Sequence, residues 1–347
     1  MLGGGLNATS LYGYGGSNMK WGLLLALGVF VILISCKDNS TEPEAIKEKV
    51  LKTEEVIFFS SDRDGKAKNI FMMSSKGSLI KQITKYTWGE YAATAISPDK
   101  NQLLFYQAAP GLDIDVGMDI YIYKIKEDSI IGPITQGHPG NFSPDGKMFV
   151  FHRHTFTTDG GFESVYLYDL TKNTEKRISE EGKTSFYAQI SPDGKFICYE
   201  SSSLRNVPVF WQLHLMDVNG NFITDLTDAI NSYWAGNGVF TPDSKSVLFH
   251  YSNWVQGYEI CKVDIVSKQI KRLTKIVAPY FNYWNPSIST FSNTIYFYGK
   301  RFDEKTRKYY TQICACDIEG ANFNVILSDS FWNSHPIADK VSYYIYK

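Results

Sequence analysis

A tight turn with the sequence Ser-Pro-Asp, followed by a short apolar run, recurs along this chain at a nearly constant interval. In the clearest copy, Ser143-Pro144-Asp145-Gly146 precedes the apolar residues Met148–Phe151. Proline presets φ, aspartate accepts hydrogen bonds from nearby backbone, and glycine adopts positive φ without a steric cost, so each copy reads as a turn between two strands. Four copies, three with serine and the last with threonine before the proline, have prolines 46, 48 and 50 residues apart: Pro98, Pro144, Pro192 and Pro242. A period of this length indicates a β-propeller or another repeat array.

Each repeat contains the same succession of strand-like runs. In the repeat that begins at Pro144, these are Met148–His152, Ser164–Asp169 and Arg177–Ser179. A variable segment then leads to the next turn. A four-stranded sheet cannot bury both of its faces alone, whereas sheets arranged around one axis cover one another and leave only short edges. The sequence therefore predicts an all-β fold, namely a six-bladed β-propeller of four-stranded antiparallel blades over residues 56–347.

The two ends of the repeat region leave alternatives for how the ring closes. Seven runs of the first type occur, including Val341–Tyr346, but only six of the second and third types. We expect six blades in which Ser334–Ala338 completes the blade begun by Val56–Thr84. Either Val56–Ser60 or Val341–Tyr346 is then displaced or paired at an edge. A partial seventh blade is the alternative.

The repeats resemble those of the TolB-type β-propeller family, whose WD-like repeats carry a Ser-Pro-Asp-Gly-Lys turn. The segments Val56–Gly65, Asn69–Met72 and Gln82–Thr84 are similar to one family repeat almost throughout. The resemblance covers residues 56–346 and implies the propeller fold. The amino-terminal domain that precedes the propeller in TolB has no counterpart here, where a lipid anchor and a short tether are expected instead.

The first residues resemble a bacterial lipoprotein signal. Met19–Gly22 and the apolar run 23–34 have the order of a short basic n-region and an h-region. Leu33-Ile34-Ser35-Cys36 resembles a lipobox, which implies cleavage before Cys36 and lipidation of that residue. A transmembrane anchor is the alternative, although about 15 apolar residues are few for a hydrocarbon core of ~30 Å.

These signals divide the chain into three parts. We expect residues 1–35 to be an upstream extension and signal peptide, 36–55 the lipidated cysteine and tether, and 56–347 the propeller. Acyl chains on Cys36 would hold the protein at a membrane surface. Lys37 occupies the position at which an aspartate favours inner-membrane retention, so the outer membrane of a bacterial cell envelope is the expected location.

Composition narrows the classes of ligand. The formal net charge is −1, and no basic patch suggests nucleic acid. Four cysteines fall on apolar runs and are expected to be small buried residues, although a disulfide between repeats stays open: Cys198, Cys261, Cys314 and Cys316. No second Cys or His pair has the spacing of zinc ligands, so we expect neither a metal nor another cofactor.

Aromatic residues concentrate in the variable segments, which should emerge near one mouth of the channel. Amphipathic rings give a large contact area at low entropic cost, so this face can bind a protein, peptide or glycan partner. The candidate ligand-binding residues are Trp88, Tyr91, Tyr233, Trp234, Tyr283, Trp284 and Trp332. Packing between blades is the alternative role for each of them. The predicted function is thus a binding scaffold in the cell envelope.

An enzyme that uses the channel, such as a metal-dependent polysaccharide lyase, is the second hypothesis. It depends on His152, His154 and His250. His250 and Glu200 occupy the repeat position of His152, eight residues after the turn proline. Equivalent positions in neighbouring blades should lie too far apart for one ion, whose bonds to histidine are ~2.0–2.1 Å. No nucleophile motif of the Gly-x-Ser-x-Gly type occurs.

The aspartates of the recurring turns have the appearance of a repeated acidic site. Side-chain bonds to the turn backbone are their more ordinary role. We therefore expect these residues to close the turns: Asp99, Asp145, Asp193 and Asp243.

Overall fold

The computed structural model of the chain describes residues 48–109, 117–158, 160–203, 210–227, 234–252, 257–276 and 280–346. Strands are the regular elements of these residues, and the all-β prediction is confirmed. Within the same ranges, no helix has the length and apolar character needed to cross a membrane. The predicted lipidation site, Cys36, lies outside the described residues.

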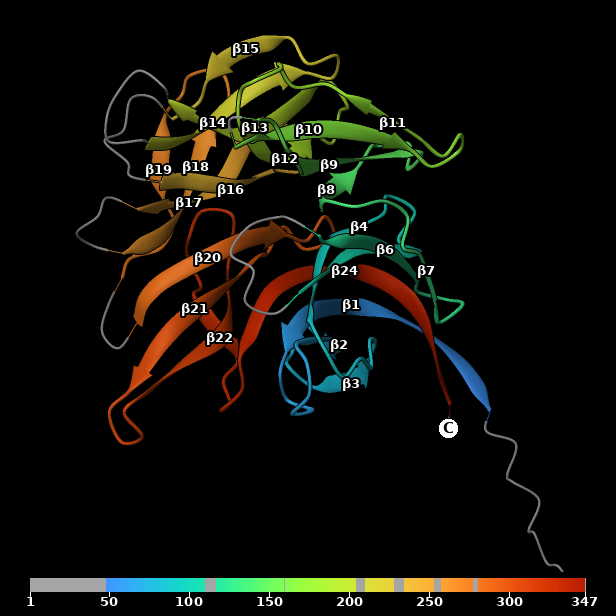
Figure 1. The fold of residues 1–347 in the computed structure, drawn as a ribbon. Coiled ribbons are helices and arrows are strands. Elements are labelled where there is room, and N and C mark those ends of the chain that lie inside the picture. The colour runs from blue at the N-terminus through green and yellow to red at the C-terminus, as the bar shows by residue number, and fades with distance from the viewer. Residues whose placement is uncertain are drawn as a thin grey trace, which may run out of the picture. The chain divides into compact units, whose positions relative to one another are not determined.

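The strands form antiparallel sheets that follow one another along the chain (Figure 1). The first contains, in spatial order, β24 (Asn333–Tyr346), β1 (Lys49–Ser61), β2 (Asn69–Ser74) and β3 (Leu79–Gln82). The second contains β4 (Glu90–Ile96), β5 (Gln102–Ala108), β6 (Asp119–Lys124) and β7 (Ser129–Ile131). The third contains β8 (His138–Phe142), β9 (Met148–Thr155), β10 (Phe162–Asp169) and β11 (Thr174–Arg177).

The next sheet has eight strands, which form two consecutive runs of four. One run is β12 (Ser185–Ile190), β13 (Phe196–Ser203), β14 (Phe210–Asp217) and β15 (Phe222–Asp225). The other is β16 (Trp234–Phe240), β17 (Ser246–Ser252), β18 (Tyr258–Asp264) and β19 (Ile270–Arg272). A single parallel pair, Trp211 with Trp234, joins the two runs. The last sheet contains β20 (Tyr280–Ile288), β21 (Ile295–Asp303), β22 (Lys308–Cys316) and β23 (Asn324–Leu327).

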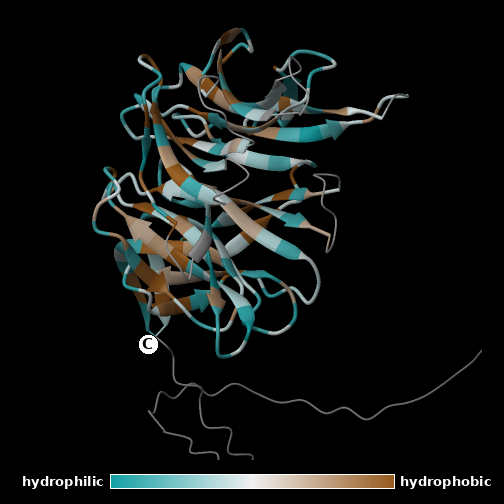
Figure 2. Ribbon diagram, turned by 90° about the vertical axis from the view of Figure 1, so that its left-hand side faces the viewer, coloured by the Kyte–Doolittle hydropathy of each residue, from teal (hydrophilic) through white to brown (hydrophobic). Residues whose placement is uncertain are grey.

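Successive residues of the second strand in each sheet pack into different hydrophobic cores. Phe149 and Phe151 of β9 share a core with Leu104 of β5. Val150, between them, packs with Ile197 of β13 instead. Each sheet is thus covered on both faces, which explains why these strands are apolar throughout rather than alternating. Figure 2 shows the strongest hydrophobic colouring along the strands and hydrophilic colouring in the connections.

The cores follow one another around a closed cycle. The core after that of Val150 joins β13 to β17, and the next joins β17 to β21. Tyr296 of β21 then packs with Ile57 and Phe59 of β1, and Val56 of β1 packs with Leu103 of β5. The chain therefore returns to its first sheet after passing through all of the others. Sheets that shield one another in this way are the arrangement that the repeats predict.

The carboxyl-terminal strand closes this cycle by pairing with the first strand. β24 is antiparallel to β1 from Asn333, opposite Ser61, to Tyr346, opposite Lys49. In Figure 1, β24 lies beside β1 along its length. Val56–Ser60 and Val341–Tyr346, which were expected to compete for one place, therefore both fit in the first sheet. Val341–Tyr346 pairs with residues 49–54, ahead of Val56, while Ser334–Ala338 pairs with residues 57–60 as predicted.

Strand β1 consequently begins within the segment that the sequence assigned to a tether. The reason lies on the partner strand, where Val341 and Tyr343 are buried in the core between β1 and β5. Backbone groups of such a buried strand need hydrogen-bonding partners, and residues 49–54 supply them. The charged sequence of the segment gave no sign of this pairing.

The turn aspartates close their own turns, as predicted. Asp145 Oδ1 accepts hydrogen bonds from Ser143 Oγ at 2.6 Å and from the backbone nitrogen of Lys147 at 3.1 Å. These bonds lower the pKa of Asp145 because they favour its charged form. Gly146, at φ 70°, occupies the left-handed position that this turn requires.

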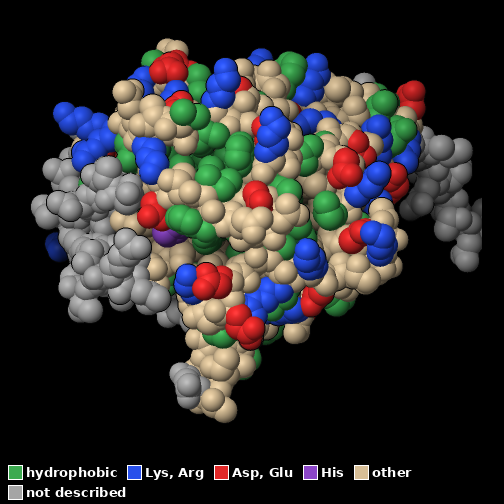
Figure 3. All heavy atoms as spheres, turned by 90° about the horizontal axis from the view of Figure 1, so that it is seen from above, with side chains coloured by type: hydrophobic (Ala, Val, Ile, Leu, Met, Phe, Trp, Pro, Cys, Tyr) green, Lys and Arg blue, Asp and Glu red, His purple; other side chains and the backbone are tan. Residues whose placement is uncertain are grey.

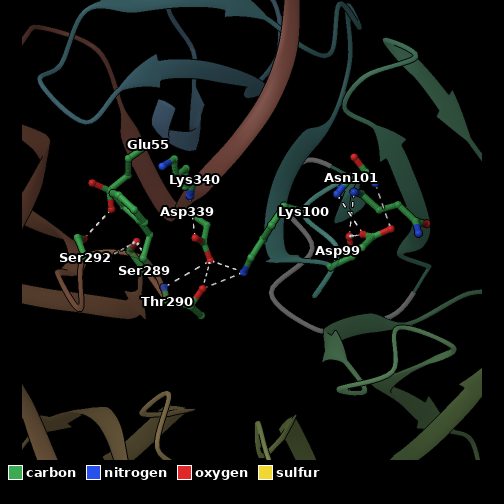
Figure 4. A network of polar contacts seen from close by, with 12 residues as sticks. Glu55, Asp99, Lys100, Asn101, Ser289, Thr290, Ser292, Asp339 and Lys340 are labelled. Carbon is green, nitrogen blue, oxygen red and sulfur yellow. Dashed lines mark hydrogen bonds and ion pairs between the residues drawn. The ribbon is translucent and has the colours of Figure 1, made fainter. Parts of the chain in front are cut away.

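At the equivalent position of the β4–β5 turn stands Lys100, with φ 61°. Its ammonium reaches across to the closing strand, where Nζ lies 2.6 Å from Asp339 Oδ2. The same Nζ lies 2.9 Å from Oγ1 of Thr290 in the β20–β21 turn (Figure 4). Thr290 Oγ1 also donates to Asp339 Oδ2 at 2.6 Å. Since β24 continues without a turn here, this group joins the β4–β5 turn, the β20–β21 turn and the closing strand.

Candidate functional site

The innermost strands of the sheets surround a cavity of about 580 Å³. β4, β8, β12, β16, β20 and β24 contact one another in this order, and β24 also contacts β4. Each of these strands contributes residues to the cavity wall. The volume lies within the range of ~300–1,000 Å³ that is usual for small-molecule sites. The cavity is therefore the channel that the repeat architecture predicts.

A bulge interrupts several innermost strands where they line the cavity. The register of pairing shifts at these points in β12, β16, β20 and in the pairing of β24 with β1. Four bulge residues have positive φ, between 46° and 51°, and all of them line the cavity: Tyr187, Asn237, Asn285 and His335. Left-handed backbone is uncommon for tyrosine and histidine, and such strain concentrates at functional sites.

Side chains from the preceding four-strand run hold two of these bulges in place. His152 Nδ1 accepts a hydrogen bond from the backbone nitrogen of Tyr187 at 3.1 Å. The fully buried Glu200 accepts from the backbone nitrogen of Asn237 and, at 2.9 Å, from Trp234 Nε1. The shared repeat position of His152 and Glu200 therefore has a structural explanation: each supports the innermost strand of the next four-strand run.

The remaining histidines of the enzyme hypothesis have separate surroundings. His250 is buried in the cavity wall, and burial lowers its pKa to about 3, so its imidazole is neutral at pH 7. His154 Nδ1 lies 2.8 Å from Glu163 Oε1, on the β9–β10 hairpin. Across the described ranges, no group of three or more His, Cys, Asp and Glu residues is arranged to hold a metal ion.

The four cysteines of the apolar runs are free and buried. Burial raises the pKa of each thiol, to about 12 for Cys261, Cys314 and Cys316, because the thiolate loses its hydration. They are small core residues, as expected from the sequence.

Aromatic rings form a belt around most of the wall. We define the aromatic belt as the following rings, in order: Tyr106, His138, Tyr187, Phe186, Trp211, Trp234, His250, Tyr258, Trp284, Tyr298 and His335. The centroids of neighbouring rings are between 4.5 and 6.5 Å apart. Every four-strand run contributes at least one of its members, and most of them line the cavity. Aromatic surface on this scale is typical of a binding site.

An ion pair stands where the belt is interrupted. Lys68 Nζ lies 2.8 Å from Glu90 Oε2, and both residues line the cavity. The same ammonium is 5.1 Å from the centroid of the half-buried Trp332 ring. The charge of Lys68 is thus matched locally, and the described cavity wall carries no net charge from this pair.

The structure separates the aromatic residues that the sequence grouped together. Trp234 and Trp284 line the cavity. Tyr91 is buried and stacks on Tyr86 at 4.3 Å, and Tyr283 is buried against Phe297 at 5.4 Å, so both pack between strands. The other three residues lie elsewhere. Trp88 is 57% exposed, Trp332 is half-buried with its ring against the Lys68 ammonium, and neither is part of the cavity wall. Tyr233 lies outside the described residues.

Other wall residues were missed from the sequence. Tyr106 and Tyr298 occupy the repeat position of His152, Glu200 and His250, and this shared position was a usable signal for both. Asn237 and Asn285 were missed because a bulge, rather than strand alternation, brings them to the cavity. Outside the cavity, the face seen in Figure 3 shows acidic and basic side chains intermixed, without a patch of one sign.

Comparisons with solved structures relate this architecture to TolB. TolB from Acinetobacter baumannii matches with a TM-score of 0.64 at 17% identity, over 82% of this chain and 66% of that one. A putative TolB from Agrobacterium tumefaciens matches with 0.55 at 18% identity, over 85% of this chain and 99% of that one. Hydrazine synthase from Kuenenia stuttgartiensis matches with 0.60 at 12% identity, over 84% and 47%. The fold is therefore a TolB-like β-propeller.

The chain spans just under two thirds of the Acinetobacter protein, at 66% of its length. No protein-family model matches this sequence. No curated protein matches it either.

Proposed function

We propose that this chain is a six-bladed, TolB-like propeller that is anchored to a bacterial envelope membrane and binds a partner in its channel. The number of blades is supported by the closed cycle of cores and by the pairing of β24 with β1. The eight-stranded sheet counts as two blades in this proposal, because one residue pair alone joins its halves.

The binding role rests chiefly on the aromatic belt around the cavity. If these rings served only to pack a core, no cavity would be expected beside them. Most rings of the belt instead line a cavity of about 580 Å³. Two features keep its rings in fixed positions: Glu200 bonds the indole of Trp234, and Trp284 stacks on Tyr298 at 5.4 Å. A pre-formed wall loses little conformational entropy when a ligand enters. A TolB-like fold is compatible with a binding scaffold.

Attachment to the membrane is proposed from the lipobox-like residues that end at Cys36. Lys37 favours the outer membrane. Replacement of Cys36 by serine should abolish incorporation of labelled palmitate and release the protein from the membrane fraction. Unchanged labelling of Cys36→Ser would refute the anchor without bearing on the cavity.

Capture of a partner from solubilised envelope extract tests the binding role. The bait is the soluble fragment 37–347, and the double variant Trp234→Ala, Trp284→Ala removes two rings of the belt. We expect the variant to lose the captured partner. Trp88→Ala is the matched control, since the same residue type is removed outside the cavity wall. Equal capture by all three proteins would contradict binding in the channel.

A further inference from the structure

The cavity wall combines ring surfaces with uncharged hydrogen-bonding groups. Its ammonium group, on Lys68, is paired with Glu90 at 2.8 Å. Burial lowers the pKa of both His250 and His335, so these imidazoles add no positive charge at neutral pH. Among the described lining residues, a polyanion or polycation would meet no unpaired opposite charge, and charges buried in that way are strongly disfavoured.

Rings and carboxamides come in pairs on three consecutive innermost strands. β12 supplies Tyr187 and Gln189, β16 supplies Trp234 and Asn237, and β20 supplies Trp284 and Asn285, all of which line the cavity. In each pair the two residues are one to three positions apart and lie at or beside the bulge. The same combination of a flat apolar surface and an amide is therefore presented three times along one arc of the wall.

We propose that the cavity binds a neutral oligosaccharide, with successive sugar units placed on these ring–carboxamide pairs. The proposal rests on the proposed function of the channel as a binding site and names the class of its ligand. A pyranose has an apolar face of C–H groups, which packs on an aromatic ring, and hydroxyl groups at its edge, which exchange hydrogen bonds with a carboxamide. Repeated pairs suit a polymer of repeated units better than a single small molecule.

Titration of the 37–347 fragment with oligosaccharides of defined charge tests this proposal. The probes are the monomer, trimer and hexamer of cellulose, of the α-1,4-glucan of starch and of N-acetylated chitin, with trigalacturonate as the anionic comparison. We expect at least one neutral series to bind, with affinity rising at least tenfold from monomer to trimer. Trigalacturonate should bind at least tenfold more weakly than the best neutral trimer.

Two variants test the placement of the ligand. Trp284→Ala should weaken binding of the best neutral trimer at least tenfold. Asn285→Gly removes the carboxamide and keeps a residue that tolerates the positive φ of this bulge, so it should fold normally and weaken binding several-fold. Trp88→Ala should leave the affinity unchanged. Circular dichroism and a thermal melt of each variant show whether it is folded.

Three results would overturn the assignment of a neutral sugar: no binding in any neutral series, tighter binding of trigalacturonate, or binding that survives both Trp284→Ala and Asn285→Gly. If the envelope extract yields a partner that is lost with Trp234→Ala and Trp284→Ala while every neutral sugar fails, the channel remains a binding site and its ligand is of another class. If neither experiment shows binding, the proposed function fails as well.

Discussion

Glu200 illustrates how single residues prepare the cavity wall. This carboxylate is fully buried, and its partners are the indole nitrogen of Trp234 and the backbone nitrogen of Asn237. A buried carboxylate is tolerated where several donors satisfy it. Both of these donors belong to β16, the innermost strand of the next four-strand run, so one side chain fixes a belt ring and a strained bulge together.

Replacing Glu200 by glutamine should therefore destabilise the fold and make the Trp234 indole less rigidly held. Glutamine keeps the size, but its NH₂ group turns a donor toward another donor, which costs about 1–3 kcal/mol at a buried site. Urea unfolding measures the stability, and near-ultraviolet circular dichroism reports on the environment of the tryptophans. The exposed Glu181→Gln should change stability by less than about 0.5 kcal/mol. Equal effects of both variants would contradict this role of Glu200.

His250 gives the molecule a dependence on pH. Its pKa is about 3 in the fold because of burial, against 6.5 in the unfolded chain. The unfolded chain therefore binds the proton more readily than the folded protein. The contribution of His250 to the free energy of unfolding is fully present above pH 6.5. It decreases as the pH falls from 6.5 toward 3, by up to about 1.4 kcal/mol per pH unit.

His250→Gln removes this titration, so the loss of stability between pH 7 and pH 5 should be smaller in the variant than in the unaltered protein. Urea midpoints at the two pH values measure both. Carboxylates elsewhere titrate equally in the two proteins and cancel in the comparison. An identical change in midpoint for both proteins would show that His250 is not held neutral.

At the scale of elements, the turns and the closing strand depend on one another. Lys100 contributes a turn residue, Thr290 a second turn, and Asp339 the buried carboxylate of β24 between them, as Figure 4 shows. The Lys100 side chain is partly exposed, so solvent weakens its ion pair with Asp339. The Asp339 side chain is buried. The group therefore links three elements that are far apart in the sequence.

Asp339→Ala should cost about 1–3 kcal/mol, because it leaves the Lys100 ammonium and the Thr290 hydroxyl without their shared acceptor. The comparison is Asp169→Ala, which removes a surface carboxylate that pairs with Lys172 and accepts from the Thr171 and Lys172 backbone in its turn. It should cost less, because water can replace these bonds at the surface. Thermal unfolding of both variants at low and high salt measures the difference. A smaller loss for Asp339→Ala than for Asp169→Ala would contradict the linking role.

The strands and turns also differ in how well the sequence predicts them. The turns and apolar runs were predicted well because their signals are local: proline, aspartate and glycine at fixed offsets, and buried strands such as Phe149–Phe151. The extension of β1 to Lys49 was missed because its partner, Tyr346, lies almost the whole propeller away in sequence. Tyr91 and Trp234 look alike in sequence, and only the bulges and neighbouring sheets decide that one is core and the other wall.

At the scale of the whole propeller, closure depends on the pairing of its first and last strands. Thr53 and Ser342 lie opposite each other in β1 and β24, and their hydroxyl oxygens are 2.7 Å apart. Directly opposite strand residues are close enough for a disulfide. This pairing holds the ring together through backbone hydrogen bonds.

The double variant Thr53→Cys, Ser342→Cys should therefore oxidise to an intramolecular disulfide and raise the melting temperature, since it closes a long loop. The four cysteines of the described chain are buried and should not interfere. Thr53→Cys with Tyr346→Cys is the mismatched control, because Tyr346 pairs with Lys49 instead. Mass spectrometry measures disulfide formation in both variants. Equal oxidation of the two pairs would contradict this register.

Photo-crosslinking in intact cells tests the central claim, that partners are received inside the ring rather than on its outside. A benzophenone amino acid would replace Trp284 or Trp234 in the cavity wall, and Trp88 or the exposed Phe222 outside it. We expect a shared crosslinked species from both cavity positions and from neither outer position. Crosslinks that form from Trp88 or Phe222 while the cavity positions give none would contradict it.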